Sequence, residues 1–243
     1  MEAYERIIVA LDVEDRAAAL RLVTILHCQV GMFKIGKQLF TAEGPSLVRE
    51  IIALGEKVFL DLKYHDIPAT VAKASVEATK LGVSMFNMHA SPDMTKAMSD
   101  SSEAVAKYCR EKNIPRPFIL GVTVLTSADA ADMEEEIPQK FMPLEQLVVL
   151  RAQRARACRL DGVIASAKEA SALRESLGRT SVIVTPGVRS KGASVDDQKR
   201  VATPGEAVRD GATYAVIGRQ LTDSNNPIKE AQAIALEIET ATN

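Results

Sequence analysis

Residues 59–68, with the sequence FLDLKYHDIP, place charged side chains inside a run that otherwise has the pattern of a buried β-strand. Charged groups are costly in a protein interior unless they are paired or take part in function. Because side chains alternate along a strand, Asp61 and Lys63 should share one face, while Leu60 and Leu62 share the other. The apolar face suits packing against helices, so we expect the charged pair to face the interior of a barrel.

The pattern of this strand recurs along the whole chain. Short apolar runs alternate with stretches that carry apolar residues at three- and four-residue spacing, which indicates strands followed by helices. The predicted strands are residues 6–12, 32–36, 57–63, 84–90, 118–126, 161–166, 181–187 and 214–219. Eight such units predict a single-domain α/β protein, a (β/α)8 TIM barrel over residues 1–243. An open doubly wound sheet is the alternative, which is disfavoured because no GxGxxG motif follows the first strand.

The composition is that of a globular protein, with 47% hydrophobic and 26% charged residues. A net charge of −2 provides no overall positive field, so neither nucleic acid nor an anionic membrane is expected as a partner. The first residues lack the pattern of a signal peptide and no apolar run has the length of a membrane span, so we expect a cytoplasmic protein. Cys28, Cys109 and Cys158 are widely spaced without a CxxC motif, which favours buried reduced thiols over disulfides or zinc ligands.

Charged residues gather where the predicted strands end, which in a barrel is the face that carries the active site. Asp12 ends the first strand and Lys34 lies in the second, so with Asp61 and Lys63 they are expected to form a network of alternating charges. An opposite charge nearby keeps a buried lysine protonated. A lysine in this network therefore suits acid catalysis rather than Schiff-base chemistry. A purely structural salt-bridge network is the alternative. We expect His65 to orient the adjoining loop.

The last two predicted strands end in VTPGVR (184–189) and AVIGR (215–219). Barrels of this type often bind phosphate at these ends through backbone N–H groups and arginine side chains. The residues in that position here are Gly187, Arg189, Gly218 and Arg219. The length and Gly/Ser content of residues 190–204 suit a mobile flap, and an inert surface loop is an equally weighted alternative. A helix is predicted to begin at the end of this segment, with Thr203 as N-cap and Pro204 as its first residue.

These motifs together resemble the bacterial type of the orotidine 5'-monophosphate decarboxylase family. DLKYHDIPATV looks like the family's DxKxxD signature, ILGVTVLTS like its fifth strand, and VTPGVR and RVATPGEAVRDGATYAVIGR like its phosphate-binding segments. The likeness runs from the first strand to the last helix. It implies decarboxylation of orotidylate to UMP, the last step of de novo pyrimidine synthesis, with neither a metal nor an organic cofactor.

The resemblance also implies roles for the charged residues. Lys63 would protonate carbon C6 of the pyrimidine after CO2 leaves, and Asp61 would lie against the departing carboxylate. Lys34 and Asp12 would contact the ribose hydroxyls and complete the charge network. Asp66 would join Lys63, Asp61 and Lys34 as a catalytic residue.

The resemblance further implies a homodimer with shared sites, because Asp66 and Thr70 would reach into the neighbouring subunit. The remaining substrate-binding residues would meet the base, hold the phosphate or close the flap: Thr126 at the base, and Pro186, Arg189, Gln198, Gly218 and Arg219 at the phosphate end. Ala69 and Gln220 depart from the family's frequent Asn and Pro, and neither position carries an assigned role.

Two other readings remain open. The related 3-keto-L-gulonate 6-phosphate decarboxylases and hexulose-phosphate synthases share a DxKxxD strand but use magnesium, for which their second strand brings an acidic ligand. Here that strand carries Lys34, a cation that works against metal binding. A non-catalytic barrel that binds a nucleotide phosphate is the second reading, although it would have no use for costly charges in the third strand.

Overall fold

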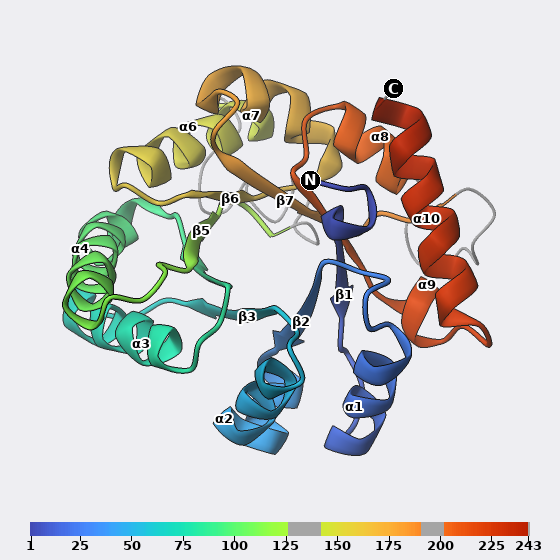
Figure 1. Ribbon diagram of the computed structural model, residues 1–243. Helices are drawn as coiled ribbons and strands as arrows, with labels where there is room; N and C mark the ends of the chain where they lie inside the picture. Colours follow the sequence, from blue (N-terminus) through green and yellow to red (C-terminus); the bar gives the residue numbers. More distant parts are fainter. Residues whose placement is uncertain (126–141, 191–201, 243) are drawn as a thin grey trace.

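The computed structural model describes residues 1–125, 142–190 and 202–242, and shows a closed barrel of parallel strands (Figure 1). The strands are adjacent in chain order, and the last pairs with the first. They are β1 (Ile7–Ala10), β2 (Met32–Gly36), β3 (Val58–Tyr64), β4 (Met85–His89), β5 (Phe118–Val122), β6 (Gly162–Ile164), β7 (Val182–Pro186) and β8 (Tyr214–Ile217). Every strand lies within a predicted run except that β3 extends to Tyr64. The predicted (β/α)8 TIM barrel is therefore confirmed.

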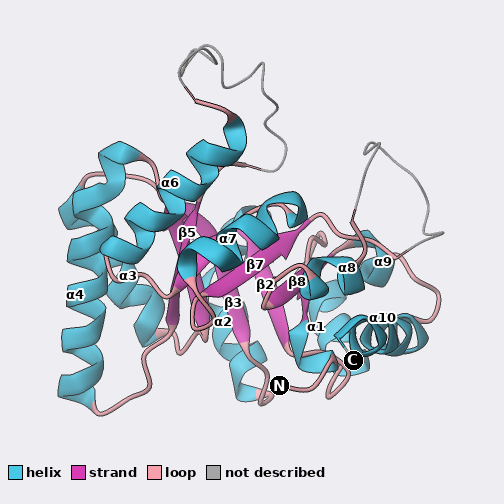
Figure 2. Ribbon diagram, turned by 90° about the horizontal axis from the view of Figure 1, so that it is seen from above, coloured by secondary structure: helices cyan, strands magenta, loops and turns pink. Residues whose placement is uncertain are grey.

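Helices surround the strands on the outside of the barrel (Figures 1 and 2). They are α1 (Arg16–Ile25), α2 (Lys37–Ala53), α3 (Pro68–Lys80), α4 (Thr95–Lys112), α6 (Leu144–Ala157), α7 (Ala170–Leu177), α8 (Pro204–Arg209), α9 (Arg219–Thr222) and α10 (Pro227–Thr242), with 3-10 turns η1 (Tyr4–Arg6), η2 (Pro92–Met94) and η3 (Ala167–Glu169). No helix among these described elements is long and apolar enough to cross a lipid bilayer.

The strand alternation divides the core into two layers. Leu60 packs in the layer between strands and helices, and the partly buried Leu62 packs against the same layer. Phe59 instead joins Met85 and other side chains that fill the barrel interior. The prediction that the leucines of the third strand face the helices is therefore confirmed, and the opposite face of β3 is directed at the barrel interior.

Helix α8 begins as its sequence predicts. The Thr203 hydroxyl accepts a hydrogen bond from the Glu206 N–H at 3.2 Å, and the Glu206 carboxylate accepts one from the Thr203 N–H at 2.9 Å. This reciprocal capping satisfies N–H groups that have no partner inside the helix. Pro204 takes the first helical position, where a missing N–H costs nothing.

The three cysteines are free, but they do not share one environment. Cys109 and Cys158 are buried, as predicted, whereas Cys28 is exposed and the prediction is wrong for it. Cys28 lies in the turn after α1 with φ of 58°. The apolar pattern of a sequence does not reveal which way a side chain points in such a left-handed turn.

Candidate active site

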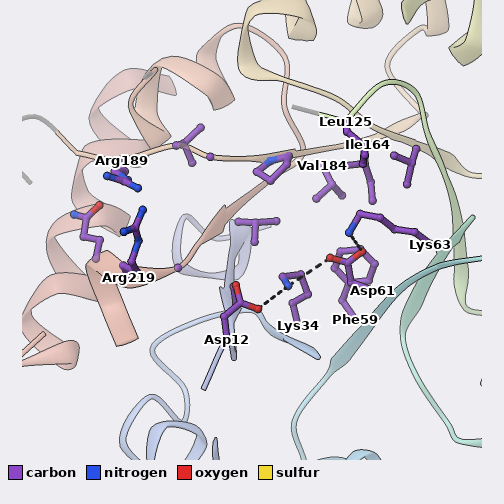
Figure 3. Close-up of a pocket in the computed structure, with 18 of the residues that line it drawn as sticks. Asp12, Lys34, Phe59, Asp61, Lys63, Leu125, Ile164, Val184, Arg189 and Arg219 are labelled. Carbon is purple, nitrogen blue, oxygen red and sulfur yellow. Dashed lines mark hydrogen bonds and ion pairs between the residues drawn. The ribbon is translucent and has the colours of Figure 1, made fainter. Parts of the chain in front are cut away.

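A pocket of about 310 Å³ opens at the carboxyl ends of the strands (Figure 3). One end of it holds Asp61 and Lys63 from β3, and the other holds Arg189 and Arg219, which follow β7 and β8. Apolar side chains form much of the remaining wall, namely Phe59, Val122, Val124, Leu125, Ile164, Val184, Val188 and Val216. The pocket therefore offers a charged end, a basic end and an apolar surface between them.

The charged end is a chain of alternating ion pairs. Lys63 Nζ lies 2.6 Å from Asp61 Oδ1, and Lys34 Nζ lies 3.4 Å from Asp61 Oδ2 and 3.2 Å from Asp12 Oδ1. The structure thus brings together the four charges that the strand ends predicted. Asp12 was predicted to end the first strand, but β1 stops at Ala10 and Asp12 lies in the following loop. The Asp12 side chain is 62% exposed, whereas that of Lys34 is 11% exposed.

Asp61 is held in its ionised form. Burial by itself raises the pKa of this carboxyl, but Lys34, Lys63 and hydrogen bonds from Lys63 and Asn87 outweigh burial and hold the pKa below its usual value. Asp61 is therefore a carboxylate at neutral pH, and each lysine of the network faces at least one negative charge.

Lys63 reaches this carboxylate through an irregular backbone. Its φ of 51° lies in the left-handed region, which non-glycine residues seldom adopt. Strand β3 pairs with β4 at Leu60 and Phe86 and next at Tyr64 and Met88, so the register shifts between these pairs. Lys63 therefore lies beside Asp61 at the pocket, as strand alternation predicted, but its backbone belongs to an irregularity and not to a regular strand.

Asn87 is a site residue that the sequence analysis missed. It is fully buried in β4. Its side-chain amide donates to Asp61 Oδ1 at 2.7 Å, and its carbonyl accepts the backbone N–H of Lys63 at 2.8 Å. The sequence does contain an indication of this role. Asn87 is an amide within the apolar run SMFNMHA, and it lies two residues after Met85, on the same inward face of the strand.

The basic end of the pocket comes from the segments after β7 and β8. Arg189 and Arg219 line it with several neighbours that include Pro186, Gly187, Gly218 and Gln220. Gln220 was not assigned a role from sequence, yet its carbonyl accepts the Ser190 N–H at 3.1 Å and its amide donates to Glu230 at 3.2 Å. Arginine side chains beside backbone N–H groups are suited to binding a phosphate.

Asp66 and Thr70 do not line the pocket of their own chain. Both are exposed, and Asp66 Oδ1 accepts the N–H of Ile67, whose side chain is 66% exposed. Thr126, Gln198 and most of the predicted flap fall outside the described residues.

His65 connects two loops at the same face of the barrel. Its Nε2 lies 2.6 Å from Asp93 Oδ2, which joins the loop after β3 to η2, and its ring centroid is 5.3 Å from that of His89. The contact agrees with the predicted loop-orienting role. Within the described ranges, no group of three His, Cys, Asp or Glu side chains is arranged to hold a metal ion.

Comparison with known proteins gives one consistent result. The sequence model of the "Orotidine 5'-phosphate decarboxylase / HUMPS family" matches residues 5–234. The orotidine 5'-phosphate decarboxylase of Moorella thermoacetica is 48% identical, with 98% of this chain and 94% of the relative covered. That of Syntrophomonas wolfei subsp. wolfei is 46% identical, with 98% and 100% covered. The crystal structure of orotidine 5'-phosphate decarboxylase from Lactobacillus acidophilus superposes with a TM-score of 0.80 at 29% identity, over 96% of this chain and 98% of that one.

Proposed function

Because the chain belongs to the orotidine 5'-phosphate decarboxylase / HUMPS family, we propose that it removes CO2 from orotidine 5'-monophosphate to form UMP in pyrimidine biosynthesis. The observation that carries this proposal is the 2.6 Å contact between Lys63 Nζ and Asp61 in a pocket whose far end holds two arginines. With the Asp61–Lys63 pair at one end and the two arginines at the other, the pocket suits a substrate that has a reacting ring at one end and a phosphate at the other.

Lys63 is the proton donor in this proposal. Loss of CO2 leaves an electron pair on C6, which a fixed cation stabilises and a proton then neutralises. The ammonium group of Lys63 supplies both the charge and the proton, so the reaction needs no metal and no organic cofactor as an electron sink. Asp61 lies against the departing carboxylate and orients Lys63 through their ion pair.

The rest of the pocket holds the substrate. Lys34 and Asp12 contact the ribose hydroxyls, and Thr126 meets the base. The phosphate is held by residues of the basic end and of the segment between β7 and α8, namely Pro186, Arg189, Gln198, Gly218 and Arg219. Binding energy from this remote group orders the reacting end and lowers the barrier there.

The proposed assembly is a cytoplasmic homodimer in which Asp66 and Thr70 enter the neighbouring subunit's site. Two observations support it. Both residues are exposed and lie away from the pocket of their own chain, and the adjacent Ile67 side chain is 66% exposed, as expected for a residue that a partner covers.

A magnesium-dependent reaction on a sugar phosphate is the second candidate, because the matching family description also names the HUMPS group. The charge network opposes it. Lys34 lies between Asp12 and Asp61, so the carboxylates that would bind a cation already face an ammonium group.

One assay separates the two. The purified protein is incubated with orotidine 5'-monophosphate in buffer with EDTA, while the loss of ultraviolet absorbance and the release of CO2 are followed. Turnover that EDTA does not reduce supports the proposal. Turnover of orotidylate that EDTA abolishes and magnesium restores contradicts the proposed metal independence. The second candidate acts on a sugar phosphate, so it predicts no turnover of orotidylate in either buffer, and that result overturns the proposed function.

A further inference from the structure

Asn87 forms hydrogen bonds with both Asp61 and Lys63, which also form an ion pair with each other. Its buried amide donates to Asp61 Oδ1 at 2.7 Å, and its carbonyl accepts the Lys63 backbone N–H at 2.8 Å. The residue has no exposed surface and does not line the pocket, so it touches no substrate there.

The hydrogen bond from the Lys63 N–H to the Asn87 side-chain carbonyl compensates for a break in strand pairing. Between the pairs Leu60–Phe86 and Tyr64–Met88, three residues of β3 lie opposite Asn87 alone. A buried backbone N–H needs an acceptor, and the irregular register removes the usual carbonyl partner on the neighbouring strand. The Asn87 side chain provides this acceptor for Lys63, whose φ of 51° is otherwise disfavoured.

The hydrogen bond from the Asn87 side-chain amide holds the carboxylate of Asp61. Asp61 Oδ1 accepts both from the Asn87 amide and from Lys63 Nζ, while Oδ2 faces Lys34. Both oxygens of Asp61 are oriented by these contacts, and the neutral amide of Asn87 helps to set the plane of the carboxylate. A neutral amide provides the donor and the acceptor at once, which neither an apolar side chain nor a carboxylate can do.

We propose that Asn87 is a positioning residue for the decarboxylation. It fixes the left-handed backbone from which Lys63 projects and the orientation of the carboxylate to which Lys63 Nζ is bound, and so it sets where the proton donor stands. This inference rests on the proposed function for its kinetic consequences, but its structural content does not depend on which substrate the site takes.

The first test compares Asn87→Ala with Met85→Ala. Met85 is fully buried on the same inward face of β4 and does not line the pocket, so it is a matched control for loss of packing. Because the hydrogen bonds to the Asp61 carboxylate and from the Lys63 backbone N–H are both lost, kcat of N87A is expected to fall about 10- to 100-fold while KM changes less than about threefold. M85A is expected to lower Tm and to keep kcat within about threefold of the wild type.

The second test is rescue by protonation in the isosteric variant Asn87→Asp. An ionised carboxylate at this position repels Asp61, whereas its protonated form donates to Asp61 and still accepts the Lys63 N–H. The ratio of N87D kcat to wild-type kcat is therefore expected to rise at least about tenfold as pH falls from about 8 to about 5.5. The same ratio for N87A should not change with pH. The proposal is overturned if kcat of N87A is near that of the wild type. It is also overturned if the kcat ratio of N87D does not change with pH. If N87A does not fold, the pH dependence of the N87D ratio is the deciding result.

A third measurement needs no turnover. Ligand-free crystal structures of the wild type and N87A are compared at Lys63. The proposal expects φ of Lys63 to leave the left-handed region in N87A and Lys63 Nζ to move away from Asp61. Unchanged geometry in N87A overturns the positioning role, even if orotidylate proves not to be the substrate, whereas a wild type without turnover overturns only the proposed function.

Discussion

The side-chain carbonyl of Gln220 accepts a hydrogen bond from the backbone N–H of Ser190 at 3.1 Å. These two residues directly follow Arg219 and Arg189, so the contact joins the two segments that bring the arginines to the basic end of the pocket. We expect this contact to influence the separation of the arginines, and with it the proposed binding of a phosphate.

Replacing Gln220 by alanine should therefore weaken substrate binding more than the chemical step. One lost hydrogen bond predicts a rise in KM of about three- to tenfold, with kcat within about twofold of the wild type. Steady-state kinetics on orotidylate checks this. Gln232→Ala is the matched control, because Gln232 also donates through its amide, to Gln29 at 3.1 Å, but lies at an exposed position outside the pocket. An equal KM in Q220A and Q232A contradicts the prediction.

Gly36 leaves room for the ion pair between Lys34 and Asp12. A Cβ atom at Gly36 would lie 3.3 Å from Lys34 Nζ and 3.5 Å from Asp12 Oδ1. Its φ of −87° is accessible to alanine, so Gly36→Ala should disturb the network without straining the backbone. We expect kcat/KM to fall about three- to tenfold and Tm to change by less than about 3 °C. Kinetics and thermal unfolding of the same preparation check both parts, and an unchanged kcat/KM contradicts the argument.

Removing the ammonium group of Lys63 separates an enzyme from a barrel that only binds a nucleotide. General acid catalysis predicts that Lys63→Ala lowers kcat about 10³-fold or more, because both the proton and the stabilising charge are lost. UMP should still bind with a Kd within about threefold of the wild type, since the basic end of the pocket is intact. Lys96→Ala is the control, because Lys96 pairs with Asp100 on the exposed face of α4. A wild type that binds UMP but never turns over orotidylate would identify the non-catalytic alternative.

The lowered pKa of Asp61 predicts a specific dependence of stability on pH. A carboxyl whose pKa is lower in the folded than in the unfolded chain stabilises the fold above its unfolded pKa, and this contribution disappears as pH falls through the folded pKa. At pH 7, Asp61→Asn should lower the free energy of unfolding by about 3 kcal/mol, because Lys63 and Lys34 lose a buried partner.

The difference between D61N and the wild type should then shrink between about pH 5 and about pH 2, because protonated Asp61 is as neutral as Asn. Urea unfolding across this range measures it. A difference that stays constant with pH contradicts a lowered pKa in the folded state.

Shared sites predict that two inactive variants restore each other. In a mixed dimer of Lys63→Ala and Asp66→Ala, one site combines the intact Lys63 of one chain with the intact Asp66 of the other. Random assortment predicts recovery of about a quarter of wild-type activity after the two are unfolded and refolded together. Absence of any recovery, with dimers verified by light scattering, contradicts the proposed position of Asp66.

Local patterns in the sequence were enough to predict the barrel and the place of its charges. The apolar runs predicted every strand, because a short continuous apolar run bounded by polar residues is a property of each segment and needs no knowledge of its neighbours. The charges of Asp61 and Lys34 were predicted at the mouth because parallel strands of a barrel bring their carboxyl ends to one face. The roles of Asp66 and Thr70 came from the resemblance to a family, and they remain proposals.

Other features depend on how the segments meet. The sequence determined that β3 carries a buried acid and a lysine with leucines on the opposite face. Only the tertiary structure decided that the backbone at Lys63 is left-handed and that Asn87 holds both groups, because these follow from the shifted register between β3 and β4. The contact of Gln220 with Ser190 likewise joins segments that are distant in sequence. Burial patterns are local and can be read along a chain, whereas register and hydrogen-bond partners are set between segments that are distant in sequence.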